Sequence, residues 1–211
     1  MDTANLRSII DDSLNEAISY EAYTALVDQL VAEEKTTGPK QHEDLVYYTK
    51  LNAQRSRRLN KTATVSEPIA TVVKSLEGSY TWLVLTESWC GDAAQILPLF
   101  QKLAEINPNI SLKLVLRDEN DALMSQFLTN GGRSIPKLIM LNEQKEVVGT
   151  WGPRPKALQE IYDAWRNDPN KPPYKEFQVD MQKWYLKDAG NSTFREIGEI
   201  LSSLEVAEVA S

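Results

Sequence analysis

The spacing of hydrophobic residues along the chain changes near residue 80. Before this point, apolar residues recur three and four positions apart, which is typical of amphipathic helices. Helices are expected on four stripes of such residues, Leu6–Ile18, Tyr23–Val31, Leu45–Leu59 and Ile69–Leu76. Gly38 and Pro39 interrupt the pattern after the second stripe, because both residue types punctuate helices. We therefore predict a helical N-terminal extension over residues 1–79.

From residue 80 onward, short apolar runs alternate with helical stripes. Strands are expected at 82–85, 112–116, 137–141 and 146–151, and helices at 96–104, 123–128 and 158–165. The first run is continuous, as in a strand that is covered on both faces. The last two strands lie so close together that they are expected to pair as an antiparallel hairpin. This order predicts an α/β fold, with a mixed four-stranded sheet flanked by helices, over residues 80–167.

The last part of the chain is predicted to be helical again. Residues 167–173, with the sequence NDPNKPP, have the composition of a linker. Apolar positions beyond it predict helices near 177–187 and 193–204. Residues 168–211 are therefore expected to form a linker followed by C-terminal helices.

Composition excludes several classes of function. The chain is 42% hydrophobic and 25% charged, as in an average soluble protein. Its formal charge of −7 disfavours non-specific binding to nucleic acid or to an anionic membrane. No run approaches the ~18 apolar residues of a membrane span, and the N-terminus lacks the basic and apolar regions of a signal peptide.

The content of cysteine and histidine limits the chemistry further. The chain has one Cys and one His, so it cannot form an intramolecular disulfide or a structural zinc site of the usual composition. We expect no metal and a cytoplasmic location, where thiols stay reduced. His42, the single histidine, lies in a polar segment and is expected to be a solvated surface residue.

The residues most suggestive of chemistry surround that one cysteine. Trp89-Cys90-Gly91-Asp92 directly follows a predicted buried strand and opens a predicted helix. A thiol at this place lies beside unpaired backbone amides and the positive end of the helix dipole, which favours the reactive thiolate. Ligand sites of α/β proteins form at such turns. A small core cysteine is the alternative interpretation, but the position favours a functional one.

A second signal, Ile135-Pro136, opens the third predicted strand. Proline is tolerated at the start of a strand, and its peptide bond can be trans or cis there. Together, the Trp-Cys-Gly-Asp motif and this Ile-Pro pair resemble the thioredoxin superfamily. Trp151-Gly152 also falls where that family places a glycine beside its active site. The resemblance covers about residues 80–167 and implies a thioredoxin-like fold.

The resemblance also implies roles for individual residues. Cys90 would be the attacking cysteine, in an environment formed by Trp89, Gly91, Asp92 and Ala93. Ile135 and Pro136 would form a cis-proline loop whose backbone binds a peptide as an added strand, with Trp151 and Gly152 beside it. The implied protein is a cytoplasmic, bacterial-type redox protein whose partner is a protein disulfide or a peptide.

Three departures from the family pattern qualify this expectation. Ala93 replaces the second active-site cysteine, Val84 replaces a buried carboxylate, and Asp92 replaces a proline. A mixed disulfide on Cys90 would therefore need an external thiol to resolve it. A carboxylate roughly 6 Å from the sulfur opposes the thiolate by about 1–3 kcal/mol at an effective dielectric of ~20–40. The helix amides act in the opposite direction with similar strength, so the sequence leaves the pKa of the thiol open.

These features leave more than one function open. The first hypothesis is a monothiol redox protein, in which Cys90 attacks a disulfide or is oxidised by peroxide, and a small thiol such as glutathione resolves the product. It needs no resident cofactor. The alternative is a redox-inactive thioredoxin-fold module that binds a peptide or protein. An iron–sulfur cluster shared by two copies is a third possibility.

Arg154 and a separate cluster of basic residues are secondary candidates. Arg154 could bind an anionic group, such as a glutathione carboxylate. Arg55, Arg57 and Arg58, with Lys61, form a basic patch that is expected to be a solvated helix face, with an acidic docking partner as the alternative.

Overall fold

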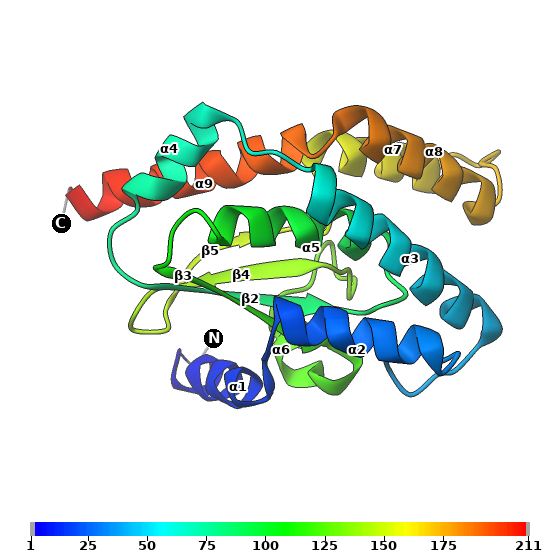
Figure 1. Cartoon of the computed structure of the whole chain (residues 1–211), viewed down its shortest axis with the longest axis horizontal. Coiled ribbons are helices and arrows are strands. Elements are labelled where there is room, and N and C mark those ends of the chain that lie inside the picture. The colour runs from blue at the N-terminus through cyan, green and yellow to red at the C-terminus, as the bar shows by residue number, and fades with distance from the viewer. Residues whose placement is uncertain (1–2, 210–211) are drawn as a thin grey trace.

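A mixed sheet of five strands lies at the centre of the molecule (Figure 1). The computed structural model describes residues 3–209, and the side chains of residues 4–204. The strands are β1 (Ile18–Ser19), β2 (Tyr80–Thr86), β3 (Ile110–Leu116), β4 (Lys137–Leu141) and β5 (Val147–Trp151). Their spatial order is β1-β3-β2-β4-β5, in which β2 and β3 are parallel and the other pairs antiparallel. The predicted α/β fold and its four strands are confirmed.

The fifth strand, β1, is an addition that the sequence pattern did not predict. Its two residues pair with Leu114 and Lys113 at the edge of β3. A two-residue strand is too short to show an alternating pattern, which explains why it was missed. Through β1, the N-terminal segment contributes a strand to the central sheet.

The helices cover both faces of this sheet. The first five are α1 (Thr3–Glu16), α2 (Tyr20–Ala32), α3 (Glu43–Thr62), α4 (Glu67–Ser75) and α5 (Gly91–Ala104). They are followed by α6 (Asp121–Gln126), α7 (Lys156–Asn167), α8 (Tyr174–Asp188) and α9 (Asn191–Val209), with a 3₁₀ turn at Arg117–Glu119. Figure 1 shows α5 and α9 on one side of the sheet and α1 and α6 on the other. Helix α3 packs against both α2 and α5, and α4 packs against α9.

A cluster of aromatic rings joins the sheet to α5. Trp82 of β2 and Phe100 of α5 are fully buried, with ring centroids 6.1 Å apart in an edge-to-face arrangement. Phe100 meets Trp151 of β5 in the same way at 5.6 Å. Each such pair adds about 0.5–1.5 kcal/mol beyond the burial of its area. This cluster fixes α5, and with it the turn that carries Cys90, on the sheet.

A second group of rings holds the C-terminal helices together. Trp165 of α7 and Phe177 of α8 are stacked, with centroids 4.7 Å apart and planes at 6°. Tyr162 and Tyr174 flank this stack. The residues between the two helices contain the predicted linker, so α7 and α8 form a hairpin that the stack closes.

Gly152 allows a close approach between the chain after β5 and the start of β4. Its φ of +109° lies in a region that side chains rarely adopt. A Cβ at this position would lie only 2.3 Å from the carbonyl oxygen of Pro136. The peptide bonds before Pro136 and before Pro153 are both cis. The glycine is therefore required by the packing of two backbone segments.

Within residues 3–209, no helix combines the length and the apolar character that a membrane crossing needs.

Gly152→Ala is expected to lower the free energy of unfolding by about 2–5 kcal/mol, because it adds backbone strain and a steric clash. Gly78→Ala is the matched control. Gly78 also has a positive φ, of +75°, but no atom lies within 4 Å of its added Cβ. Gly78→Ala should lower the free energy of unfolding only by the cost of the left-handed backbone conformation, about 1–2 kcal/mol. Denaturant unfolding of both variants measures the difference, and equal losses would contradict the proposed clash.

Candidate active site

Cys90 lies in the turn between β2 and α5, as the sequence predicts. It is the N-cap residue of α5, and its sulfur accepts a hydrogen bond from the amide of Ala93 at 3.4 Å. The thiol donates to the carbonyl oxygen of Ile135 at 3.3 Å. The structure thus brings the cysteine motif and the Ile135-Pro136 loop together. Cys90 is buried, with only 8% of its surface exposed.

A cleft of about 320 Å³ lies next to Cys90. Trp89, Gly91 and Asp92 line it from the cysteine motif, and Ser134 and Ile135 line it from the proline loop. Further walls come from α3 and α8, which contribute Leu45, Tyr48, Tyr174, Gln178, Met181 and Gln182. Both flanking regions of the chain therefore help to form the site.

Asp92 forms a buried ion pair at the start of α5. Its Oδ2 lies 2.7 Å from a guanidinium nitrogen of Arg154, and the two side chains are 6% and 9% exposed. The hydroxyl of Tyr185, on α8, donates to Oδ1 at 2.9 Å. The Arg154 guanidinium also stacks on the ring of Tyr162, 4.2 Å from its centroid. Arg154 is therefore paired with Asp92. Its guanidinium is not the free ligand-binding cation that the sequence suggested.

The surroundings of Cys90 favour the neutral thiol. Burial, and after it the negative charge of Asp92, raise the pKa of the Cys90 thiol to about 12. The amide of Ala93 and the guanidinium of Arg154 act in the opposite direction but do not outweigh these effects. The balance that the sequence left open is decided by burial, a quantity that no local motif reveals.

Two helices from outside the sheet cover the cysteine motif. A Cβ on Gly91 would lie 3.4 Å from the Gln182 side chain of α8 and 3.6 Å from the Arg55 guanidinium of α3. Gln182 also accepts a hydrogen bond from Gln95 of α5 at 2.7 Å. Arg55 is half-buried beside the motif, so its expected place on a solvated helix face is wrong. Arg57, in the same patch, is exposed as expected.

Trp89 forms the outer wall of the cleft. Its ring is half-buried, and the Arg117 guanidinium lies over it at 4.8 Å. Arg133 lines the same wall. Both arginines have acidic partners, Asp118 for Arg117 and Asp121 for Arg133. On this wall, the ring of Trp89 is therefore surrounded by arginines whose charges are balanced by neighbouring aspartates.

Trp151, which the resemblance places beside the proline loop as a substrate-binding residue, does not line the cleft next to Cys90. Its indole packs against Phe100 and donates to Glu196 of α9 at 2.8 Å. The side chain points into the core because alternate residues of β5 face opposite sides of the sheet. Gly152 acts through its contact with the Pro136 carbonyl.

Glu87 is a buried carboxylate that the sequence reasoning missed. Val84 is fully buried in β2, as expected, but Glu87 follows the strand and is also fully buried. It accepts hydrogen bonds from the Thr37 hydroxyl and, at 2.9 Å, from the amide of Asp118. Burial raises the pKa of this carboxyl group. A carboxylate directly after a buried strand was the available signal.

The neighbour of Glu87 ties the N-terminal region to the cysteine motif. The hydroxyl of Ser88 accepts from the amide of Thr37 at 3.1 Å, and the amide of Ser88 donates to the Thr37 hydroxyl at 2.9 Å. Thr49 of α3 lies 2.9 Å from the same Ser88 hydroxyl. Asn52 donates to the Ser88 carbonyl at 3.0 Å. This cluster positions the turn just before Cys90.

No metal-binding group of three or more His, Cys, Asp or Glu side chains occurs in the part of the chain that the structure describes. His42 is an exposed residue at the start of α3 and does not lie in the Cys90 cleft.

Comparison with solved structures supports the fold. A protein of unknown function from Pseudomonas aeruginosa is similar over 92% of this chain and 95% of its own, with 18% identity and a TM-score of 0.58. An HIV epitope-scaffold is similar over 89% of this chain and 98% of its own, with 18% identity and a TM-score of 0.54. At these identities the likeness concerns the fold alone. No curated protein matched the chain.

The family model described as "Thioredoxin" matches residues 38–166, which is more than half of the chain. The match begins well before the segment that carries the motif resemblance, and it includes α3, one of the helices over Cys90. With the sheet order, the Cys90 turn and the Ile135-Pro136 loop, it identifies the family. The chain belongs to the thioredoxin family.

Proposed function

We propose that the protein is a monothiol redox protein, in which Cys90 undergoes thiol–disulfide exchange and an external thiol completes the cycle. The observation that carries this proposal is the position of the Cys90 sulfur, 3.3 Å from the carbonyl oxygen of Ile135 in a cleft at the start of α5. A partner peptide bound along the proline loop would bring its disulfide to this sulfur. The thioredoxin-family fold supports a redox function in general.

The proposed exchange reaction uses one protein thiol, that of Cys90, and two external thiols. The Cys90 thiol loses its proton to solvent, and the thiolate bonds to one sulfur of the partner disulfide while the other sulfur leaves as a thiolate. Ala93 stands where an internal thiol would resolve the adduct, so a small thiol such as glutathione must attack it. A second small thiol then frees Cys90, and the two small thiols end as one disulfide. The partner is reduced and Cys90 is regenerated.

The environment of the thiol requires the site to open before it reacts. A thiol whose pKa is raised to about 12 carries far less thiolate at pH 7 than a free cysteine, whose pKa is ~8.5. Burial is the main cause of the shift, so exposure to solvent or replacement of the α8 contacts by a partner would relieve it. We therefore propose that α8 stays packed beside the cysteine motif in the resting state and that the cleft opens before Cys90 reacts.

A binding module without turnover is the second candidate function. The burial of the thiol and the negative charge of Asp92 favour it, because both oppose a reactive thiolate. In this case the cleft would bind a peptide without forming a covalent bond.

The reaction of the folded wild-type protein with glutathione disulfide separates the two candidates. Under the redox proposal, the wild-type protein gains one glutathione on Cys90, and Cys90→Ser, which has no thiol, is the control that gains none. Mass spectrometry of the intact protein measures the adduct. A wild-type protein that forms no adduct until it is unfolded would support the binding module instead.

The rate of alkylation of Cys90 is expected to reach half its maximum at a pH well above ~8.5, the midpoint of a free thiol. Only the thiolate reacts, and the pKa of this thiol is raised. The unfolded chain should return to that midpoint. The same shift affects stability: above pH ~8.5 the unfolded chain loses its thiol proton and the folded chain keeps it, so the free energy of unfolding falls as pH rises. Cys90→Ser, which lacks this proton, isolates the effect. A midpoint below 8.5 for the folded protein would contradict the closed site.

Ala93→Cys is expected to create a dithiol site. The amide of Ala93 already lies 3.4 Å from the Cys90 sulfur, so a thiol at residue 93 has access to an adduct on Cys90. The variant should release a reduced partner without a small thiol and form an internal disulfide. Reduction of insulin disulfides, followed against the wild-type protein and Ala94→Cys, measures the gain. Equal rates in all three proteins would count against exchange at Cys90.

A further inference from the structure

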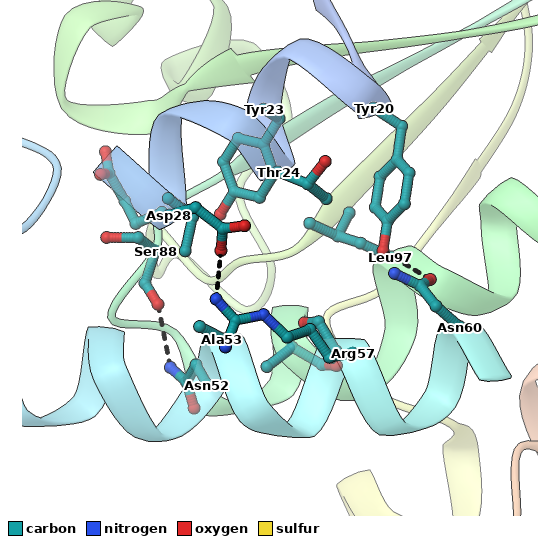
Figure 2. A pocket seen from close by; sticks show the side chains of 14 residues that line it. Tyr20, Tyr23, Thr24, Asp28, Asn52, Ala53, Arg57, Asn60, Ser88 and Leu97 are labelled. Atoms are coloured by element: carbon teal, nitrogen blue, oxygen red, sulfur yellow. Dashed lines mark hydrogen bonds and ion pairs between the residues drawn. The ribbon is translucent and has the colours of Figure 1, made fainter. Parts of the chain in front are cut away.

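A second pocket lies behind the cysteine motif, between α2 and α3 (Figure 2). Its volume is about 210 Å³. Tyr20 and Tyr23 line it from α2, Asn52 and Ala53 from α3, and Leu97 from α5. It is separate from the cleft beside Cys90, with which it shares no lining residue.

The pocket opens to solvent where the exposed side chains of Asp28 and Arg57 line it, and its inner wall is buried. Its volume suits one small ring, since a cavity on the order of 150 Å³ is large enough to bind benzene. The hydrogen bonds between the N-terminal region and Ser88 hold α3 in place beside the pocket. These hydrogen bonds therefore fix the α3 wall of the pocket.

One part of the wall is apolar and aromatic. Tyr20 and Tyr23 are buried, with 5% and 6% of their surfaces exposed. Ala53 and Leu97, also buried, complete this part, and Val27 adds to it. Two aromatic rings beside small aliphatic side chains suit a flat ring, since aromatic pairs gain from edge and face contacts.

Another part of the wall offers hydrogen-bond donors. The Oδ1 atom of Asn60 accepts from the hydroxyl of Tyr20 at 2.9 Å, while its amide nitrogen makes no hydrogen bond within the described residues. Arg57 uses one terminal nitrogen for Asp28, at 2.6 Å, and its other N–H groups make no hydrogen bond there either. Figure 2 shows Asn60 next to Tyr20, and Arg57 facing Asp28. A bound molecule with an acceptor atom could replace solvent at these donors.

The charges around the pocket favour a neutral molecule. The half-exposed pair of Arg57 and Asp28 is electrically compensated. The buried carboxyl group of Glu87 lines the inner wall, where Thr37 and the Asp118 amide already bind it. An anion would meet two carboxyl groups, and a cation would compete with Arg57 for Asp28. Both kinds of ligand would also lose their hydration on entry.

We infer that the pocket between α2 and α3 is a binding site for a small, uncharged aromatic molecule that carries a hydrogen-bond acceptor such as a carbonyl oxygen. The ring lies between Tyr20, Tyr23 and Leu97, and the acceptor faces Asn60 and Arg57. The site does not depend on the thiol of Cys90, so it stands apart from the proposed redox function.

Benzamide is a suitable probe, because it combines an aromatic ring with a carbonyl oxygen and has no charge. We expect saturable one-to-one binding to the full chain, with a dissociation constant on the order of 1 mM or tighter, measured by NMR titration. Benzoate and benzylamine, which carry opposite charges, should each bind at least about tenfold more weakly. Cys90→Ser should bind benzamide as the wild-type protein does.

Ala53→Phe tests the location of the site, since its ring would fill the pocket from α3. We expect at least about a tenfold loss of benzamide affinity and no loss of thermal stability, as for other cavity-filling changes. Ala22→Phe is the matched control, because Ala22 is exposed on α2 and outside the pocket. Thr24→Phe, at the pocket wall on α2, serves as the test if Ala53→Phe does not fold.

Three results would overturn the inference. The first is the absence of saturable benzamide binding up to ~10 mM, about ten times the weakest expected dissociation constant. The second is benzamide binding that survives the pocket-filling substitution unchanged, because the probe would then bind elsewhere. The third is an equal affinity for benzamide and benzoate, which would contradict the chemistry assigned to the pocket.

Discussion

Burial of the Asp92 carboxylate is the constraint on which the arrangement of the site depends. A charge removed from water at the start of α5 must be compensated, and removing one partner of such a pair costs about 3–5 kcal/mol. The compensation comes from Arg154 in the turn after β5 and from Tyr185 of α8. One carboxylate thus joins the helix that carries Cys90, the end of the sheet and the C-terminal hairpin. The aromatic stack of Trp165 and Phe177 closes that hairpin from the other side.

The sequence predicted the features that depend on local patterns. Four strands showed as short apolar runs, and the N-cap position of Cys90 followed from the strand before it and the helix after it. The thioredoxin-like fold followed from the motif pair and is confirmed. The two-residue strand β1 has no pattern of its own, so only its pairing with β3 reveals it.

Features that depend on distant segments could not be predicted. Arg154 and Asp92 are far apart in sequence, and nothing in either segment marks them as partners. The cleft beside Cys90 is lined by α3 and α8, which the pattern assigned to extensions of unknown position. The same holds for Arg55, which looks like a surface residue of an amphipathic helix until α5 is placed beside it. The pKa of the thiol depends on these contacts, and therefore on tertiary structure.

The cover over Cys90 makes this thiol a reporter of local motion in the C-terminal hairpin. In a covered site, the observed rate of a reaction equals the intrinsic rate multiplied by the fraction of time that the cover is open, as in amide hydrogen exchange. A change in the Trp165–Phe177 stack, which lies in α7 and α8, would then alter that fraction without touching the sulfur. Differences in thiol reactivity between variants would accordingly measure a local unfolding equilibrium as well as the chemistry of the cysteine.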